Sequence, residues 1–202
     1  MAIALMESPL LLPTPDQPRR KRWTRAECAI LEGSGLIDPM KFELIGGELI
    51  DKMGKYRPHV DALALVVGWL IQLFGVRHVN TEAPIDVAPE DNPTNEPQPD
   101  AIVLRPSYKG FKTAVPQPAD LLLVIEVASS SLGFDLATKA ALYARAGIIE
   151  YWVLDTAGQR ILVHRNPENG RFTDVVAYDR ADSVSTLAKP TETLAVANVF
   201  PE

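Results

Sequence analysis

The clearest pattern in the chain is a run of apolar residues at helical spacing over residues 58–75, which predicts a long amphipathic helix. Two shorter helices are expected on the same grounds. One starts at Thr24, a residue type that caps helix N-termini, and reaches about residue 31. The other covers residues 134–146 and ends at Gly147, which suits a helix C-terminus.

Continuous apolar runs and alternating patterns predict the strands. The most apolar run, residues 121–127, is typical of a central strand that is covered on both faces. Other strands are expected over residues 42–45, 48–50, 76–88, 100–104, 150–155, 161–165 and 171–178. This order of elements predicts an α/β fold with a mixed, curved sheet flanked by helices, in which the helix over 134–146 links two parallel strands.

Gly46 and Gly47 stand between two alternating runs and predict a tight hairpin, because a two-residue turn favours glycine at positive φ. In that register Glu43 and Glu48 lie on one face of the hairpin as diagonal neighbours. The acidic face fits a solvated surface and a functional site equally well. The opposite face is expected to pack on the core, and it holds Phe42, Leu44 and Leu49.

Composition and charge narrow the class of protein. With 202 residues, 47% of them hydrophobic, the chain fits one globular domain over residues 23–202 after a proline-rich, flexible arm at 1–22. A net charge of −6 disfavours a protein that coats nucleic acid non-specifically, but it is compatible with a nuclease whose acids surround a metal. The chain has no stretch of roughly 20 apolar residues and no basic leader region, so we expect a cytoplasmic protein with no membrane partner. The single cysteine, Cys28, is expected to be a buried thiol on a helix face.

Two carboxylates stand in or beside the apolar strands. Glu126 lies inside the run 121–127, and Asp100 opens the strand 100–104. Burying a lone carboxylate costs free energy unless it is paired or meets a cation. Magnesium prefers oxygen ligands, and it can neutralise a phosphodiester and activate water for its hydrolysis. We therefore expect Asp100 and Glu126 to hold Mg²⁺ or Mn²⁺ at one end of the sheet. The sequence contains no glycine-rich nucleotide-binding motif, no zinc-ligand spacing and no Gly-x-Ser-x-Gly motif of serine hydrolases.

The helix that follows Glu126 carries Asp135, Lys139 and Tyr143 at four-residue spacing, so the three side chains share one stripe. A lysine beside the metal would orient the attacking water or stabilise the charge that develops on phosphorus. The spacing also fits a surface ion pair between Asp135 and Lys139, and taken alone it favours that interpretation. His59 stands at the start of the long helix, and a lone histidine is more often a surface or structural residue than a functional one.

An ordered set of segments resembles the Uma-two family, restriction-endonuclease-like proteins of the PD-(D/E)XK nuclease superfamily. The resemblance spans about residues 24–200 and rests on residues 43–49, His59, Pro99 and Asp100, residues 126–129, Asp135, Lys139, Tyr143 and residues 151–155. It implies a restriction-endonuclease-like fold, a magnesium-dependent nuclease site that acts on DNA, and often a homodimer.

The same resemblance assigns roles to residues. It implies that Asp100 is the first metal ligand and Glu126 the second. It places Glu43, Glu48 and His59 in the N-terminal motif, where one glutamate completes the metal shell. Glu48 is a candidate metal ligand, and the choice between Glu43 and Glu48 stays open. Asp135 and Tyr143 are further candidate site residues on the helix.

The chain departs from the superfamily pattern at one important position. The lysine normally lies two residues after the glutamate, where this chain has Ala128, so Lys139 resembles a displaced equivalent. Two alternatives therefore stay open. One is a non-catalytic homodimeric binding module that keeps the fold, which the missing lysine and the acidic charge favour. The other is a metal-assisted hydrolase of small phosphorylated compounds.

Overall fold

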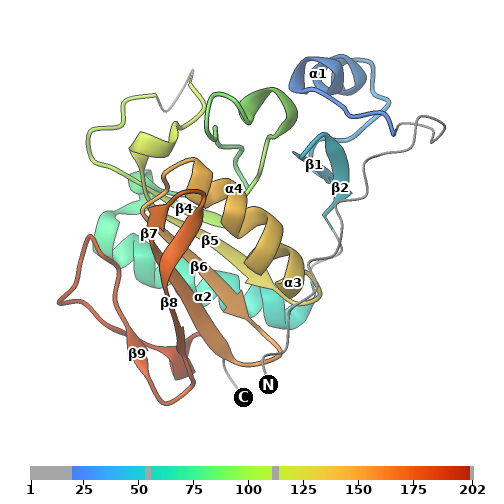
Figure 1. The fold of residues 1–202 in the computed structure, drawn as a ribbon. Helices are drawn as coiled ribbons and strands as arrows, with labels where there is room; N and C mark the ends of the chain where they lie inside the picture. Colours follow the sequence, from blue (N-terminus) through green and yellow to red (C-terminus); the bar gives the residue numbers. More distant parts are fainter. Residues whose placement is uncertain (1–19, 53–55, 111–113, 201–202) are drawn as a thin grey trace, which may run out of the picture.

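A six-stranded mixed sheet forms the centre of the computed structural model, which describes residues 20–52, 56–110 and 114–200 (Figure 1). Its strand order is β3-β4-β5-β6-β7-β8, where β5 and β6 are parallel and the other neighbours antiparallel. The strands are β3 (Val79–Thr81), β4 (Ala101–Leu104), β5 (Leu121–Ala128), β6 (Glu150–Asp155), β7 (Arg160–Glu168) and β8 (Arg171–Tyr178). The predicted α/β fold with a mixed sheet is confirmed. Of the predicted arm, residues 1–19 lie outside the described residues.

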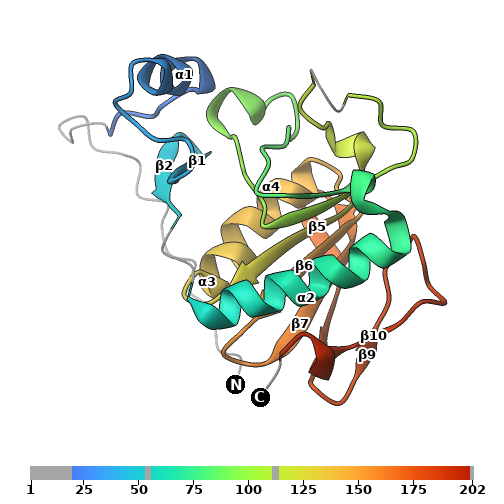
Figure 2. The ribbon, with the colours of Figure 1, turned by 180° about the vertical axis from the view of Figure 1, so that it is seen from behind.

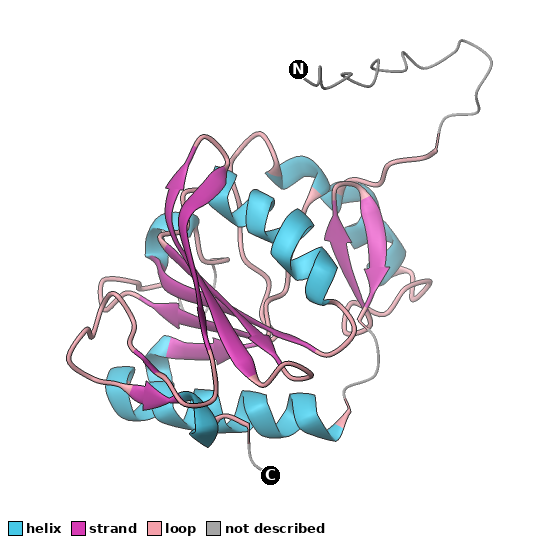
Figure 3. Ribbon diagram, turned by 60° about the horizontal axis from the view of Figure 1, so that its bottom comes forward, coloured by secondary structure: helices cyan, strands magenta, loops and turns pink. Residues whose placement is uncertain are grey.

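Helices cover both faces of this sheet (Figures 2 and 3). The long helix α2 (Arg57–Phe74) lies across one face, where its buried Val66 and Leu70 belong to the same apolar cluster as Ile125 and Trp152. The other face is covered by the connection between β5 and β6. Because side chains alternate along a strand, Glu126 shares the face of Val124 and Ala128, which belong to this second cluster.

The connection between β5 and β6 was expected to be one regular helix over 134–146, and it consists of three segments. It starts with α3 (Leu132–Phe134), continues as a π-helical segment, η4 (Asp135–Lys139), and ends as α4 (Ala140–Arg145). π-helical turns are rare, and they occur frequently at functional sites. Asp135 and Lys139 are the end residues of this segment, and both side chains are buried.

The predicted hairpin is present, with β1 (Phe42–Ile45) paired to β2 (Glu48–Asp51) in the expected register. Gly46 and Gly47 have φ of 59° and 78°, as the turn requires. Both faces of strand β1 are buried, because Leu44 lies on one face and Glu43 and Ile45 lie on the other, so the solvated-surface interpretation does not hold at Glu43. Ile45 joins the apolar cluster beside α4, and Leu44 forms an antiparallel bridge to Glu96.

The N-terminal helix α1 (Arg25–Gly33) lies beside the hairpin (Figures 1 and 2). Thr24 forms a capping box with Glu27, and Cys28 is buried as expected. Arg25 ties the helix to the loop that precedes β4 through an ion pair of 2.6 Å with Asp86. The hairpin and α1 are thus anchored to the body of the protein.

The strand expected over residues 76–88 is mostly absent. A 3-10 turn, η1 (Val76–His78), leads into the short strand β3, which ends before Glu82 adopts a φ of 54°. Pro84 has no N–H to donate to a neighbouring strand, and Ile85 donates instead to the carbonyl of Pro97.

The remaining elements are short. Three are 3-10 turns, η2 (Asn92–Thr94), η3 (Pro118–Asp120) and η5 (Val196–Asn198), and two are the paired strands β9 (Ser183–Val184) and β10 (Leu194–Ala195). None of the helices in the described part of the chain combines the length and the apolar character needed to cross a membrane.

Candidate active site

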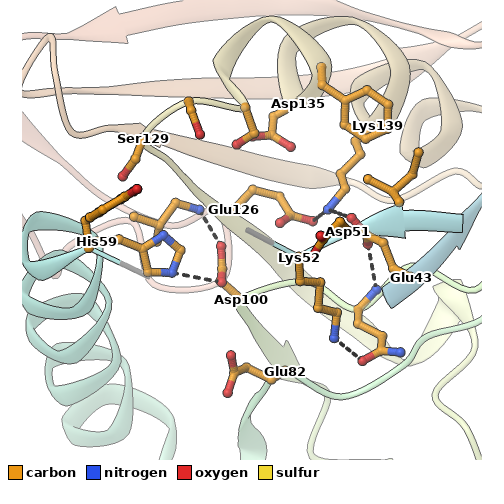
Figure 4. A pocket seen from close by; sticks show the side chains of 17 residues that line it. Glu43, Asp51, Lys52, His59, Glu82, Asp100, Glu126, Ser129, Asp135 and Lys139 are labelled. Atoms are coloured by element: carbon orange, nitrogen blue, oxygen red, sulfur yellow. Dashed lines mark hydrogen bonds and ion pairs between the residues drawn. The ribbon is translucent and has the colours of Figure 1, made fainter. Parts of the chain in front are cut away.

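A pocket of about 270 Å³ opens where β5, the β5–β6 connection, the hairpin and the start of α2 meet (Figure 4). Most of its charged lining is acidic. Among the described residues, six carboxylates and two lysines line it, namely Glu43, Asp51, Glu82, Asp100, Glu126 and Asp135 with Lys52 and Lys139. The acids come from segments that are far apart in the sequence, so the fold itself gathers them.

Lys139 lies between two carboxylates inside this pocket. Its Nζ is 2.8 Å from Oε1 of Glu43 and 2.9 Å from Oε1 of Glu126, and all three side chains are at most 7% exposed. Burial alone would lower the pKa of Lys139, but the carboxylates of Glu126 and Glu43 outweigh it and raise the pKa above its usual value. Lys139 is therefore a permanent cation and not a proton acceptor.

Glu126 is held by two donors on the same oxygen. Lys139 and the hydroxyl of Tyr143, which donates at 2.8 Å, both contact Oε1. Burial raises the pKa of Glu126, and the nearby carboxylates of Asp100, Asp135 and Glu43 raise it further, whereas Lys139 acts in the opposite direction. When these carboxyl groups are ionised, they carry more negative charge than one lysine neutralises, and a divalent cation would balance it.

Asp100 is tied directly to the strand that carries Glu126. The backbone N–H of Val127 donates to its Oδ2 at 2.8 Å, and Nε2 of His59 lies 3.1 Å from its Oδ1. His59 is buried at the start of α2, so it positions Asp100 and is not a surface residue. The predicted convergence of Asp100 and Glu126 on one pocket is present (Figure 4).

Asp135 is also a buried residue of the pocket, with 2% of its surface exposed. Its Oδ2 accepts a hydrogen bond of 2.6 Å from the hydroxyl of Ser131, and its carbonyl accepts one from Tyr151. Burial raises the pKa of Asp135 to about 6, although Lys139 and Ser131 lower it. The interpretation as a surface ion pair with Lys139 is wrong, because both side chains are buried and Lys139 pairs with Glu43 and Glu126.

The structure distinguishes the two glutamates of the hairpin. Glu43 lines the pocket, is 6% exposed, and its Oε2 accepts a hydrogen bond from the backbone N–H of Gln98. Glu48 is exposed and does not line the pocket, so of the two candidate glutamates the structure brings Glu43, and not Glu48, to the site. Both lie on the hairpin face that was expected, but only the end that holds Glu43 reaches the pocket.

Several other residues that line the pocket were not predicted from the sequence as site residues. Lys52 and Tyr56 stand between the hairpin and α2, both of which were predicted, so their position near the pocket could have been inferred. Glu82 reaches the pocket through its left-handed backbone conformation, which the sequence does not indicate. Ser129 and Ser130, interpreted only as turn residues, also line the pocket.

The donor set suits magnesium better than a softer metal. The acidic side chains of the pocket offer oxygen atoms alone, which hard cations prefer. No group of three acidic, histidine or cysteine side chains in the described ranges stands close enough to enclose a metal by itself. Magnesium fits such a site, because it retains several waters and is bound through one or two carboxylates together with substrate phosphate.

Comparisons with known proteins identify a family and a similar fold. A family model described as Uma2, putative restriction endonuclease, matches residues 34–197. The fold is similar to the crystal structure of a putative nuclease from Anabaena variabilis, with a TM-score of 0.64 and 16% identity over 79% of this chain and 89% of that one. No curated protein matches the sequence.

Proposed function

This chain belongs to the Uma2 family of putative restriction endonucleases, and from that premise we propose that it is a magnesium-dependent endonuclease that hydrolyses phosphodiester bonds of DNA. The observation that carries the proposal is the meeting of Asp100, Glu126 and Lys139 in one acidic pocket. These three residue types supply two oxygen ligands and one fixed cation, which phosphodiester hydrolysis requires.

Asp100 and Glu126 would hold the metal, and Glu43 stands beside them. When bound, magnesium neutralises the phosphate and lowers the pKa of a coordinated water. His59 and the N–H of Val127 fix Asp100, while Tyr143 and Lys139 fix Glu126, so neither carboxylate has to reorganise when substrate enters.

In the chemical step the oxygen of a water attacks phosphorus and that water releases a proton to solvent, while the bond from phosphorus to the leaving oxygen breaks and the leaving oxygen takes up a proton from solvent. Lys139 remains protonated throughout, so its part is to orient that water and to stabilise the negative charge that develops on the phosphoryl oxygens. This cation comes from η4 of the helical layer, whereas Ala128 occupies the strand position of the superfamily lysine and is buried in the core.

The test combines cleavage with metal binding. Plasmid DNA and oligonucleotides are incubated with the wild type and with Asp100→Asn in the presence of magnesium, and thermal unfolding is recorded with and without the metal. We expect cleavage and a magnesium-dependent rise in Tm for the wild type, and neither for Asp100→Asn. Unchanged cleavage by Asp100→Asn refutes the assignment. A folded wild type that binds neither magnesium nor manganese in calorimetry supports the binding module instead.

A further inference from the structure

Tyr56 is an exposed aromatic residue that lines the acidic pocket. Tyr56 lines the pocket and is 70% exposed, whereas Glu126 and Lys139 are each 4% exposed. Exposed aromatic rings that border a nucleic-acid site serve as platforms on which bases stack. The pocket therefore has buried, charged lining residues, Glu126 and Lys139, and an exposed aromatic one, Tyr56.

A rigid turn of helix connects this ring to the interior of the pocket. Tyr56 is the N-cap of α2, and its carbonyl accepts hydrogen bonds from the N–H groups of His59 at 3.0 Å and Val60 at 3.2 Å. His59 contacts Asp100 in turn. The backbone of Tyr56 is thus fixed relative to the candidate metal ligand, although its ring is open to solvent.

The charge of the pocket disfavours a substrate that is held mainly through its phosphates. Proteins that bind nucleic acid in this way, duplex or single-stranded, neutralise several phosphates with lysine and arginine, so contacts to a base would have to supply affinity here. The described residues that line the pocket include only Lys52 and Lys139 as such cations, against six carboxylates. Lys139 forms ion pairs with Glu43 and Glu126, so its remaining N–H serves the reacting phosphate and not the rest of the DNA backbone, and Lys52 donates a hydrogen bond to Gln98.

The depth of the site also bears on the substrate. A phosphodiester has to pass into a recess to meet Glu126, which an unpaired strand can do by bending, whereas a strand inside a duplex must first be unpaired or extruded at a cost in free energy. Ser129 and Ser130 line the same pocket and are exposed, so their hydroxyls offer phosphate contacts that carry no charge.

We propose that the substrate of this site is unpaired DNA, a single strand or the unpaired part of a branched molecule, with one base stacked on Tyr56. This inference rests on the proposed nuclease function and adds the class of substrate to it. Stacking on one ring is independent of the base, so the selection is for strandedness and not for sequence.

The test measures binding separately from cleavage. The probe is a short fluorescent oligodeoxynucleotide, used single-stranded and annealed to its complement, and anisotropy is recorded in EDTA so that no metal supports hydrolysis. We expect the wild type and Tyr56→Phe to bind the single strand at least tenfold more tightly than the duplex. Tyr56→Ala and Tyr56→Leu should lose about tenfold in affinity for the single strand, the size of one base–aromatic stack.

The matched control is Ile30→Ala, which removes a side chain of similar exposure, 71%, on α1. It should bind as the wild type does. Equal or tighter binding of the duplex, or unchanged binding by Tyr56→Ala, overturns the substrate class even if DNA is cleaved. Tyr56-dependent binding of single strands without any magnesium-dependent cleavage supports the substrate class and refutes the catalytic function.

Discussion

Nζ of Lys139 lies 2.8 Å from Oε1 of Glu43, which joins the helical connection between β5 and β6 to the N-terminal hairpin. The same ammonium group contacts Glu126 on β5 at 2.9 Å. One lysine on the β5–β6 connection therefore contacts both the N-terminal hairpin and strand β5 inside the acidic pocket. Structural and functional consequences of changing it can be separated by experiment.

Replacing Lys139 with methionine should lower the free energy of unfolding by about 3–5 kcal/mol, because two buried carboxylates lose their cation. Adding Glu126→Gln to this variant should recover part of the loss, since it removes one of the two unpaired charges. Chemical denaturation of the wild type, both single variants and the double variant gives the coupling energy. Additive effects in that cycle would contradict a direct Lys139–Glu126 interaction.

The two hairpin glutamates should behave differently in activity assays. Glu43→Gln removes a charge that contacts Lys139 and should reduce kcat for DNA cleavage by about tenfold to a hundredfold, the range typical of a lost partner beside a metal site. Glu48→Gln alters an exposed residue outside the pocket and serves as the matched control, with cleavage unchanged. A larger loss for Glu48→Gln than for Glu43→Gln would contradict the site as described.

Asp135 should make the metal-free protein less stable as pH rises from about 4 to 6. The pKa of Asp135 is raised from 3.8 to about 6, so the folded state binds the proton more tightly than the unfolded state does. The contribution of Asp135 to the free energy of unfolding is fully present below pH 3.8 and is lost as the pH rises to about 6. The difference, at 1.36 kcal/mol per pH unit, corresponds to about 3 kcal/mol.

Asp135→Asn should therefore unfold at a higher Tm than the wild type at pH 7.5 and at nearly the same Tm at pH 3.5. Glu192→Gln removes an exposed carboxylate and is the control for the general effect of losing one negative charge. If the Asn variant is less stable than the wild type at pH 7.5, ionised Asp135 stabilises the fold and the sign is wrong.

Local patterns were sufficient to predict most elements of the fold. The glycine pair, the apolar run of β5 and the periodicity of α2 gave the hairpin register, the buried strand and the long helix within a few residues. Each of these depends on interactions between neighbours in sequence or on burial of one apolar face. The prediction of a strand over 76–88 was wrong because Glu82 and Pro84 interrupt the extended backbone. The backbone hydrogen bonds of this segment are formed with residues that are distant in the sequence.

The site was predicted less completely, because its contacts form between elements that are distant in the sequence. Buried Glu126 was identified because its apolar surroundings leave no local partner, but its partners Lys139 and Tyr143 become neighbours only when the helix packs on the sheet. Likewise the choice between Glu43 and Glu48 depends on where the hairpin docks, which the bridge from Leu44 to Glu96 fixes.

The placement of the cation on η4 has a consequence for how this protein tolerates change. Lys139 and Glu126 belong to different layers, so their separation depends on how the helical layer packs on the sheet through the apolar cluster that includes Leu142 and Val124. A substitution that slides one layer over the other by a fraction of an ångström would misalign the two groups while the chain still folds. Variants at the interface between the helical layer and the sheet do not contact substrate. Their kcat should therefore fall even where their unfolding transition stays cooperative.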